Sequence, residues 1–202
     1  MIAQLRPGLH RWTAPHPEWD PGAEPGGALD WPELVGSAAV VCDGGLVVVD
    51  PQLPPDPEAI WPELDALVQA AGGRVTAVTT IRFHGRSVPA LVERYGAVHL
   101  KASQAAMAGV EPFVVPEADE TMLWLPGPRA LVPGDRLIAF GHGGGLRVCP
   151  ATWLDYLPSG LTVEGLKERL RPLLDLPVEL VLVSHGEPVL QDGHAALSKA
   201  LA

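Results

Sequence analysis

The apolar residues of the chain form short, mostly β-branched runs of strand length, separated by segments in which apolar residues recur at helical spacing. Two such runs lie on either side of Asp43-Gly44-Gly45, and Asp-Gly between apolar runs is typical of a β-hairpin. Asp50 and Pro51 end the second run. The pattern therefore predicts a hairpin in this part of the chain.

After the hairpin, strand-length and helix-length segments alternate. Leu64, Leu67 and Val68 share helical spacing, and Ser87 and Gly96 are suited to begin and end a second helix. The predicted elements are a helix within 56–72, a buried strand over 75–81, a loop over 82–87, a helix from 88 to 95 and a strand over 97–102. A strand–helix–strand order indicates a right-handed crossover within one sheet.

The second half of the chain repeats this order. The predicted elements are two short strands within 121–133 joined at Pro126-Gly127-Pro128, a third strand over 136–140, a helix through Leu166, Leu170, Leu173 and Leu174 bent at Pro172, a buried strand over 178–186 and a closing helix over 194–201. Two such halves predict an α/β fold with two β-sheets face to face and helices outside. With no visible repeat or linker, we expect one domain over 1–202.

The first 36 residues are rich in proline, glycine and tryptophan, and their apolar residues follow neither the alternation of a strand nor the spacing of a helix. Trp12, Trp19 and Trp31 lie in this segment, and their large apolar rings are unfavourable in water. We therefore expect an irregular arm that packs on the domain rather than a free tail.

Composition limits the partners and the compartment. The net charge of −10 and the sequence pI of about 5.0 argue against nucleic acid or an anionic membrane as the main partner. Apolar runs fall far short of the ~20 residues of a membrane span, and the first residues lack the apolar stretch of a signal peptide. Cys42 and Cys149 cannot form a CxxC pair, so we expect reduced thiols and a cytoplasmic protein.

Polar residues gather at three strand ends: the loop 82–87, Gly134-Asp135 and the segment 184–188. Taken singly, each has an ordinary structural explanation, namely a loop histidine, a turn aspartate and a histidine that closes a strand. The other histidines are expected at the surface (His10, His16, His194) or in a structural role (His99), and the stretch 142–145 as a surface loop or an anion-binding nest.

Together, these segments resemble the metallo-β-lactamase-fold hydrolases along nearly the whole chain. The matching segments are LVVVDPQ (46–52), TAVTTIRFHGRSVPALVERYGAVHL (76–100), WLPGPRALVPGDRLIAF (124–140) and LVLVSHGEPVL (180–190). The resemblance implies an αββα sandwich of two mixed β-sheets flanked by helices. It also implies a cleft with two metal ions, usually zinc, that activate a water against esters, thioesters, lactams or phosphodiesters.

The metal ligands of that family are largely replaced here. In its HxHxDH loop, the first His aligns with Arg82, the second with His84, the Asp with Arg86 and the last His with Ser87. The bridging Asp matches Asp135 and the final His matches His185, but no histidine occurs between residues 100 and 141 for the remaining ligand. Each of the two metal positions would keep two protein ligands, fewer than the three typical of catalytic zinc.

The leading hypothesis is therefore a pseudoenzyme with a decayed dinuclear site, acting as a non-hydrolytic binding or accessory protein or with altered chemistry. It predicts no cofactor and a small-molecule ligand in a cleft at Arg82, His84, Arg86, Ser87, Asp135 and His185. The alternative is a working hydrolase with one zinc ion on His84, Asp135 and His185, acting on an ester, thioester or similar small substrate. A purely structural domain is the third interpretation.

The arginines of the loop lead to one further expectation. Without metal, the buried carboxylate of Asp135 lacks a partner, and a guanidinium can bind a carboxylate through two hydrogen bonds. We expect Arg86, or else Arg82, to form an ion pair with Asp135. The alternative is that both arginines point into solvent.

Overall fold

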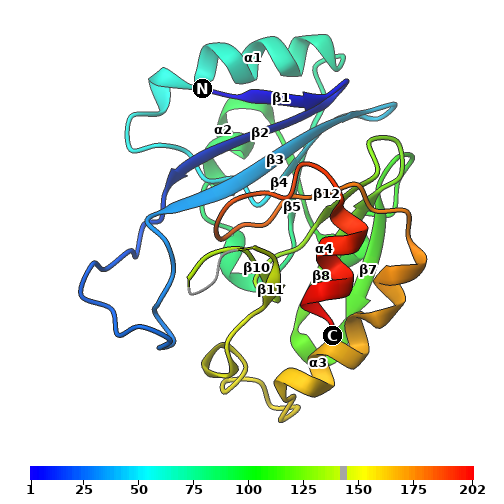
Figure 1. Cartoon of the computed structure of the whole chain (residues 1–202). Coiled ribbons are helices and arrows are strands. Elements are labelled where there is room, and N and C mark those ends of the chain that lie inside the picture. The colour runs from blue at the N-terminus through cyan, green and yellow to red at the C-terminus, as the bar shows by residue number, and fades with distance from the viewer. Residues whose placement is uncertain (142–144) are drawn as a thin grey trace.

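The computed structural model describes residues 1–141 and 145–202 and contains two main β-sheets (Figure 1). The six strands of the first sheet follow one another in chain order: β1 (Ala3–Arg6), β2 (Leu9–Pro15), β3 (Leu34–Cys42), β4 (Gly45–Val49), β5 (Val75–Thr79) and β6 (Val98–Lys101). The first four pair antiparallel, whereas β4, β5 and β6 are parallel. The sheet is therefore mixed.

The second sheet has the order β12-β9-β8-β7 and is also mixed. Its strands are β7 (Glu111–Val115), β8 (Glu120–Leu125), β9 (Ala130–Val132) and β12 (Leu180–Val181). A separate antiparallel ribbon is made of β10 (Leu137–Ile138) and β11 (Arg147–Val148). This ribbon and the segment after β12 lie beside each other, because Ala139 bridges Gly186.

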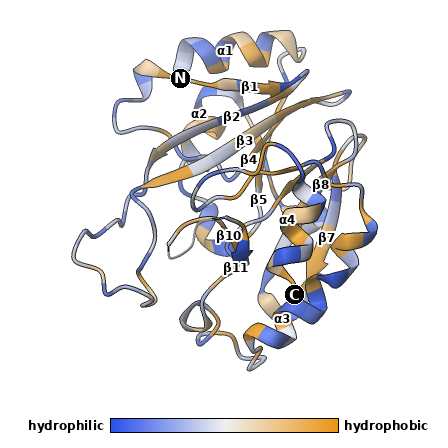
Figure 2. Cartoon of the chain, viewed as in Figure 1, coloured by the Kyte–Doolittle hydropathy of each residue, from blue (hydrophilic) through white to orange (hydrophobic). Residues whose placement is uncertain are grey.

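The α-helices of the described residues lie outside the sheets (Figure 1). They are α1 (Trp61–Ala70), α2 (Val88–Tyr95), α3 (Val163–Leu170) and α4 (Gly193–Ala200). Figure 2 shows hydrophobic and hydrophilic residues along each of them, as expected for a helix that covers a sheet on one side and meets solvent on the other. The predicted α/β class, two mixed sheets flanked by helices, is confirmed.

Three apolar clusters account for this layering. One lies between the sheets and joins Val47, Val49 and Val78 of the first sheet to Leu123 and Leu180 of the second. Another fills the space between the first sheet and the helices α1 and α2, and the third lies between the second sheet and α3 and α4. Because residues of a central strand face a cluster on each side, β4 is buried along its whole length.

Local sequence explains several boundaries. The β3–β4 hairpin turns at Asp43-Gly44 as predicted, and a Cβ on Gly45 would lie 2.5 Å from the carbonyl oxygen of Arg74. Gly96 ends α2 in the left-handed conformation. Ser87 stands at the N-cap of α2, but its hydroxyl accepts a hydrogen bond from the amide of Leu53 instead of capping the helix.

The N-terminal segment differs from the expected irregular arm. Residues 3–15 form the hairpin β1–β2 at the edge of the first sheet, and Trp12 is buried in β2, where its indole donates to the carbonyl of Gln52. Only 16–33 is irregular; there Trp31 packs on the domain, whereas Trp19 is exposed. The proline and glycine residues over 15–27 dominate the composition of the first 36 residues. For this reason the alternation of buried and more exposed side chains along β2 was not recognised.

The second half also contains three departures from prediction. The expected strand over 178–186 is buried, but regular pairing is limited to Leu180–Val181. The expected strand over 136–140 belongs to the small ribbon rather than to the main sheet, and β7 was not predicted. The stretch 142–144, where we considered an anion-binding nest, lies outside the described residues.

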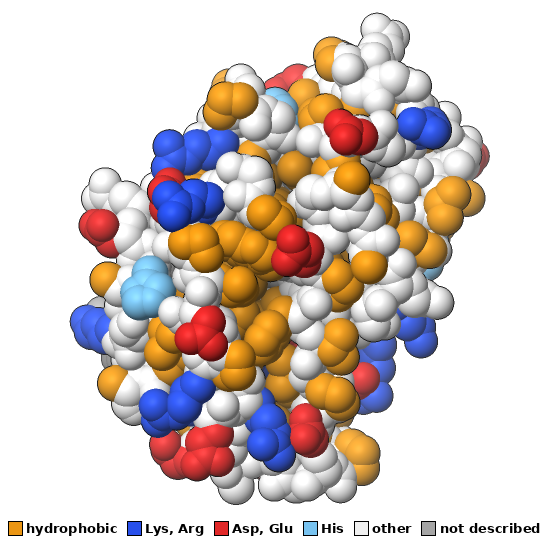
Figure 3. All heavy atoms as spheres, turned by 90° about the vertical axis from the view of Figure 1, so that its right-hand side faces the viewer, with side chains coloured by type: hydrophobic (Ala, Val, Ile, Leu, Met, Phe, Trp, Pro, Cys, Tyr) orange, Lys and Arg blue, Asp and Glu red, His pale blue; other side chains and the backbone are white. Residues whose placement is uncertain are grey.

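Three remaining features concern the surface, the cysteines and the length of the helices. Apolar side chains gather in the middle of one face, with charged side chains around them (Figure 3). Cys42 and Cys149 are both free thiols. Among the described residues, no helix is both long and apolar enough to cross a membrane.

Candidate active site

The candidate site begins with Asp50, which follows β4 in a left-handed backbone conformation with φ of 48°. Its buried carboxylate accepts hydrogen bonds from the amide of Thr80 at 2.8 Å and from the Thr80 hydroxyl. The same carboxylate lies 2.8 Å from Nδ1 of His84. Asp50 thus joins the end of β4 to the loop after β5 and determines how the His84 ring is oriented.

His84 lies at the end of a 3₁₀ turn after β5 and is 1% exposed. Its Nε2 lies 3.0 Å from Oδ1 of Asp135. Burial lowers the pKa of His84, but the carboxylates of Asp135 and Asp50 outweigh burial and raise it to about 9. In the absence of a metal ion, this imidazole therefore carries a positive charge between two carboxylates near neutral pH.

Asp135 sits in a turn between β9 and β10 that Glu120 holds in place. The Glu120 carboxylate accepts hydrogen bonds from the amides of Gly134, Asp135 and Arg136 at 3.0, 2.7 and 3.0 Å. A Cβ on Gly134 would lie 2.6 Å from the Thr80 hydroxyl, so this glycine allows the turn to approach β5 closely. Burial raises the pKa of Glu120 to about 7.

The charge of the Asp135 carboxylate depends on the two histidines beside it, and the backbone of its turn depends on Arg136. Burial raises the pKa of Asp135, but His84 and His185 together hold it well below the usual range of a carboxyl group. Arg136 is buried and donates to the carbonyls of Ala118 and Trp153. The turn is thus fixed on both sides by buried hydrogen bonds.

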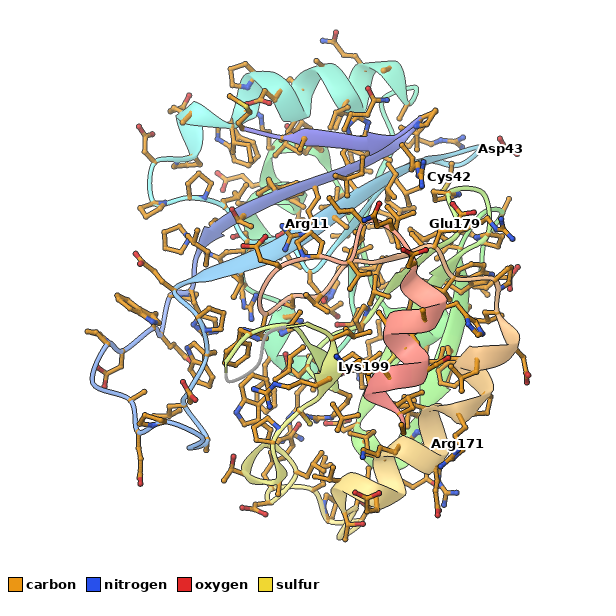
Figure 4. The ribbon with its side chains drawn as sticks, in the orientation of Figure 1. Arg11, Cys42, Asp43, Arg171, Glu179 and Lys199 are labelled. Atoms are coloured by element: carbon orange, nitrogen blue, oxygen red, sulfur yellow. The ribbon has the colours of Figure 1, made fainter. Side chains whose placement is uncertain are left out.

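His185 follows β12 and approaches the same oxygen of Asp135 as His84 does, with Nε2 3.2 Å from Oδ1. Arg11, labelled in Figure 4, reaches this segment from β2, and its Nη2 donates to the carbonyls of Val183 at 3.4 Å and Gly186 at 3.2 Å. Burial lowers the pKa of His185, only partly offset by Asp135. His185 is thus a neutral ring beside a carboxylate.

The residues of this cluster fit a single metal ion. His84, Asp135 and His185 each offer one ligand atom, and these atoms lie within 4.8 Å of one another. Nε2 of His84 and Oδ1 of Asp135 are buried, yet neither has a hydrogen-bond partner of acceptable geometry. Two imidazoles and one carboxylate are the donor set of many catalytic zinc sites, and the Asp50–His84 contact is the outer contact that such a histidine usually makes.

The described residues do not fit the full ligand set of a dinuclear metal site, because the side chains at the loop positions of the family ligands make other contacts. Arg82 is exposed, pairs with Asp119 at 3.3 Å and stacks over Phe83 and Tyr156. Ser87 binds the backbone of Leu53. Neither side chain can hold a metal ion in this arrangement.

The ion pair expected between an arginine and Asp135 is not formed. Arg86 makes neither an ion pair within 4.0 Å nor a hydrogen bond with any described residue, and its Nη1 is buried. His84 and His185 both lie against Oδ1 of Asp135 instead, at 3.0 and 3.2 Å. Burial lowers the pKa of Arg86, and the charges of Asp50, Asp135 and Glu18 oppose that effect.

A cavity of about 300 Å³ opens next to the cluster. His84, Asp135 and His185 line it together with Arg86, and aromatic side chains form much of the remaining wall: His16, Trp31, Phe83, Trp153 and Tyr156. The His16 and Trp31 rings lie 4.8 Å apart, and Trp153 meets His185 at 5.2 Å. The structure therefore brings four of the six predicted cleft residues to one cavity.

His10 and His16 do not lie at the surface as expected. His10 is buried in β2, and His16 lines the cavity, where burial and then the positive charge of Arg86 lower its pKa to about 3. His194 and His99 are exposed, and His99 lies 3.3 Å from the Thr79 hydroxyl.

Several residues of the site were missed from sequence. Asp50 lies in the matching segment 46–52, and a carboxylate at the end of an apolar strand is a signal for a functional residue. From the sequence alone, Asp50 was recognised only as the end of that strand. Trp31, Trp153 and Glu120 carry no comparable signal, because their places depend on how distant segments pack.

Comparisons with solved structures agree with this arrangement. No protein-family model and no curated protein matches the chain. A metallo-β-lactamase from Pontibacter korlensis is similar over 100% of this chain and 98% of its own, with a TM-score of 0.60 and 12% identity. A metallo-β-lactamase family protein from Thermus thermophilus matches 98% of this chain and 78% of its own, with a TM-score of 0.56 and 16% identity.

The DIM-1 metallo-β-lactamase is similar over 99% of this chain and 95% of its own, with a TM-score of 0.53 and 16% identity. Identities this low carry the fold and not the activity. Two mixed sheets, the outer helices and a His-Asp-His cluster at strand ends agree with what the sequence resemblance implied. The chain has the metallo-β-lactamase fold.

Proposed function

We propose that the protein binds one metal ion through His84, Asp135 and His185 and hydrolyses a small ester, thioester or similar compound in the adjacent cavity. The observation that carries this proposal is the convergence of three ligand atoms, two of them buried without a hydrogen-bond partner. Buried polar atoms are costly when unpaired, and a bound cation would satisfy both. A bound zinc ion would supply an activated water and polarise a carbonyl group.

The protein's own residues prepare this site. Asp50 accepts the Nδ1 proton of His84 and so leaves Nε2 free as a ligand. Glu120 fixes the turn that carries Asp135, and Arg11 fixes the backbone on both sides of His185. The aromatic wall of the cavity excludes water around a bound substrate.

A second candidate function is non-hydrolytic binding of a small molecule, and the charge of His84 favours it. A protonated His84 between Asp50 and Asp135 would take the place of the metal ion and neutralise part of their charge. The cavity would then bind a ligand without cleaving it. Metal content separates this function from the first.

The test is elemental analysis of protein purified without chelator, followed by zinc titration of chelator-treated protein. We expect about one metal ion per chain, lost in His84→Ala and His185→Ala because two ligands hold zinc poorly. His99→Ala is the matched control, since His99 is exposed and its side chain contacts Thr79 rather than the cluster of His84, Asp135 and His185. A wild-type chain that binds zinc no better than His84→Ala would refute the hydrolase and leave the binding function.

A further inference from the structure

Unpartnered hydrogen-bond donors are concentrated around the cavity. Eight buried side-chain nitrogen or oxygen atoms of the described chain lack a hydrogen-bond partner, and six of them belong to residues that line the cavity. Three of the six belong to the proposed metal ligands: Nε2 of His84, Oδ1 of Asp135 and Nδ1 of His185. The other three are Nη1 of Arg86, Nε1 of Trp31 and Nε1 of Trp153.

These three atoms share one chemical property, because guanidinium and indole nitrogens donate hydrogen bonds and cannot accept them. A molecule that satisfies them must therefore bring acceptors. Arg86 adds a permanent positive charge with no carboxylate within 4.0 Å among the described residues. A guanidinium with a buried nitrogen and no direct hydrogen-bond partner is unfavourable, so an anionic acceptor is the partner that the site lacks.

Nearby charges limit the anion to a single negative charge. Asp135 and Glu18 line the same cavity as Arg86, and neither makes an ion pair with it. A dianion such as a phosphate monoester would meet the repulsion of these carboxylates more strongly than a monoanion would. A carboxylate also matches the planar fork of the guanidinium.

The cavity walls specify the rest of the ligand. Trp31 and His16 form one tilted pair of rings, and Phe83 meets Tyr156 edge to face at 5.6 Å. Flat apolar groups pack well against such faces and edges. A cavity of about 300 Å³ has room for a compound of one or two rings and not for a peptide.

We propose that the cavity binds a monocarboxylate with a flat, apolar body, and that Arg86 pairs with its carboxylate while the indoles of Trp31 and Trp153 donate to its oxygens. This inference rests on the proposed function for the identity of the site and adds the class of its ligand. It does not require a metal ion, so the two proposals can fail separately.

The test uses full-length protein treated with chelator, so that a carboxylate cannot bind through metal. Benzoate is titrated to millimolar concentration while the indole N–H signals are followed by NMR, with Trp31→Phe and Trp153→Phe used for assignment. We expect saturable shifts of the Trp31 and Trp153 signals. Benzamide, which has the same shape without the charge, should bind roughly tenfold more weakly or worse.

Two variants identify the residue responsible. Arg86→Gln should weaken benzoate binding by roughly tenfold or more, since it removes a hydrogen bond to a charged group. Arg82→Gln removes the same charge from the same loop but from an exposed side chain that pairs with Asp119, and it should change affinity by less than about twofold. An unfolded Arg86→Gln is recognised by the loss of NMR dispersion, and Arg86→Lys then serves as the variant, with weaker binding expected.

Four results would overturn the proposal. The first is that the wild-type protein fails to bind benzoate, and the second is that benzamide binds as tightly as benzoate. The third is that the Arg86 variants bind benzoate as well as Arg82→Gln does. Phenyl phosphate binding more tightly than benzoate would also contradict it, because the nearby carboxylates should disfavour a dianion. Zinc titration of the same samples tests the metal site independently.

Discussion

Replacing Asp50 by asparagine should weaken metal binding while leaving the fold intact. The backbone of Asp50 has φ of 48°, a conformation that asparagine adopts more readily than most residues. The amide oxygen of the substituted side chain can still accept the hydrogen bond from the Thr80 amide. The change therefore acts on the second carboxylate oxygen, which faces the Thr80 hydroxyl and Nδ1 of His84.

The size of the effect follows from these two contacts. A hydrogen bond to a charged group contributes about 1.5–3 kcal/mol and a neutral one about 1 kcal/mol. The asparagine amide can donate to the Thr80 hydroxyl, which can turn to accept, so part of the loss is recovered. We expect the free energy of unfolding in chelator to fall by about 1–3 kcal/mol, and zinc affinity to fall about 10- to 100-fold because Nδ1 of His84 no longer has a carboxylate acceptor.

The stability change is measured by urea unfolding followed by tryptophan fluorescence, and the affinity by competition with a chromophoric chelator. Asp43→Asn is the matched control, since Asp43 lies at the exposed tip of the β3–β4 hairpin (Figure 4) and the same chemical change there should alter neither quantity. An Asp50→Asn variant that binds zinc like the wild type would refute the role of Asp50 in orienting His84.

Three further outcomes are expected. The pKa of His84 rises on folding from 6.5 to about 9, so protonation of His84 stabilises chelator-treated protein fully below pH 6.5. The free energy of unfolding should fall by up to about 3 kcal/mol as the pH rises to 9, measured by urea unfolding at each pH. A free energy of unfolding that does not change with pH would contradict the charge on His84. Glu120→Gln turns an amide donor toward the backbone amides of 134–136 and should lower the free energy of unfolding by about 2 kcal/mol in the same assay. A variant as stable as the wild type would exclude the role of Glu120 in holding the Asp135 turn. Arg11→Met keeps the aliphatic packing and should speed hydrogen exchange around His185. Exchange at β7, which pairs with β8 and not with β2, is the internal control, and unchanged exchange around His185 would contradict the role of Arg11.

Much of the fold follows from the sequence pattern, because the periodic segments are those that bury one face. The helix with Leu64 and Val68 and the hairpin at Asp43-Gly44 form where the spacing predicts them. The pattern fails where pairing is not periodic. Leu180–Val181 is the only regularly paired part of a longer buried run in the described chain, since the rest of the run makes only isolated bridges, such as that of His185 with Val35 of β3.

The candidate site was predictable only in part. His84, Asp135 and His185 stand at strand ends, and their meeting follows from the packing of the two sheets. Trp31 and His16 come from an irregular segment whose path depends on contacts with Trp153 and His185. No local rule places such a segment, so the aromatic wall could not be derived from spacing.

The expectation for Arg86 failed for an instructive reason. It assumed that the carboxylate of Asp135 lacked a partner and that the nearest guanidinium would fill the gap. His84 already supplies that charge, because Asp50 on one side and Asp135 on the other keep its ring protonated in the absence of metal. The residue pattern contains no sign of this competition, since Asp50 is distant along the chain and its contact with His84 exists only in the folded protein.

The supports of the three candidate ligands also bear on the choice between a functional and a purely structural domain. Each ligand has its own polar support from another part of the chain: Asp50 for His84, Glu120 for Asp135 and Arg11 for His185. Buried polar groups add little net stability, and well-packed apolar residues often stabilise a core as well or better. Stability alone therefore gives no reason for three separate supports to converge on one point with unpaired ligand atoms. A site that must hold a cation does give such a reason, because the ligands have to be fixed before the ion arrives.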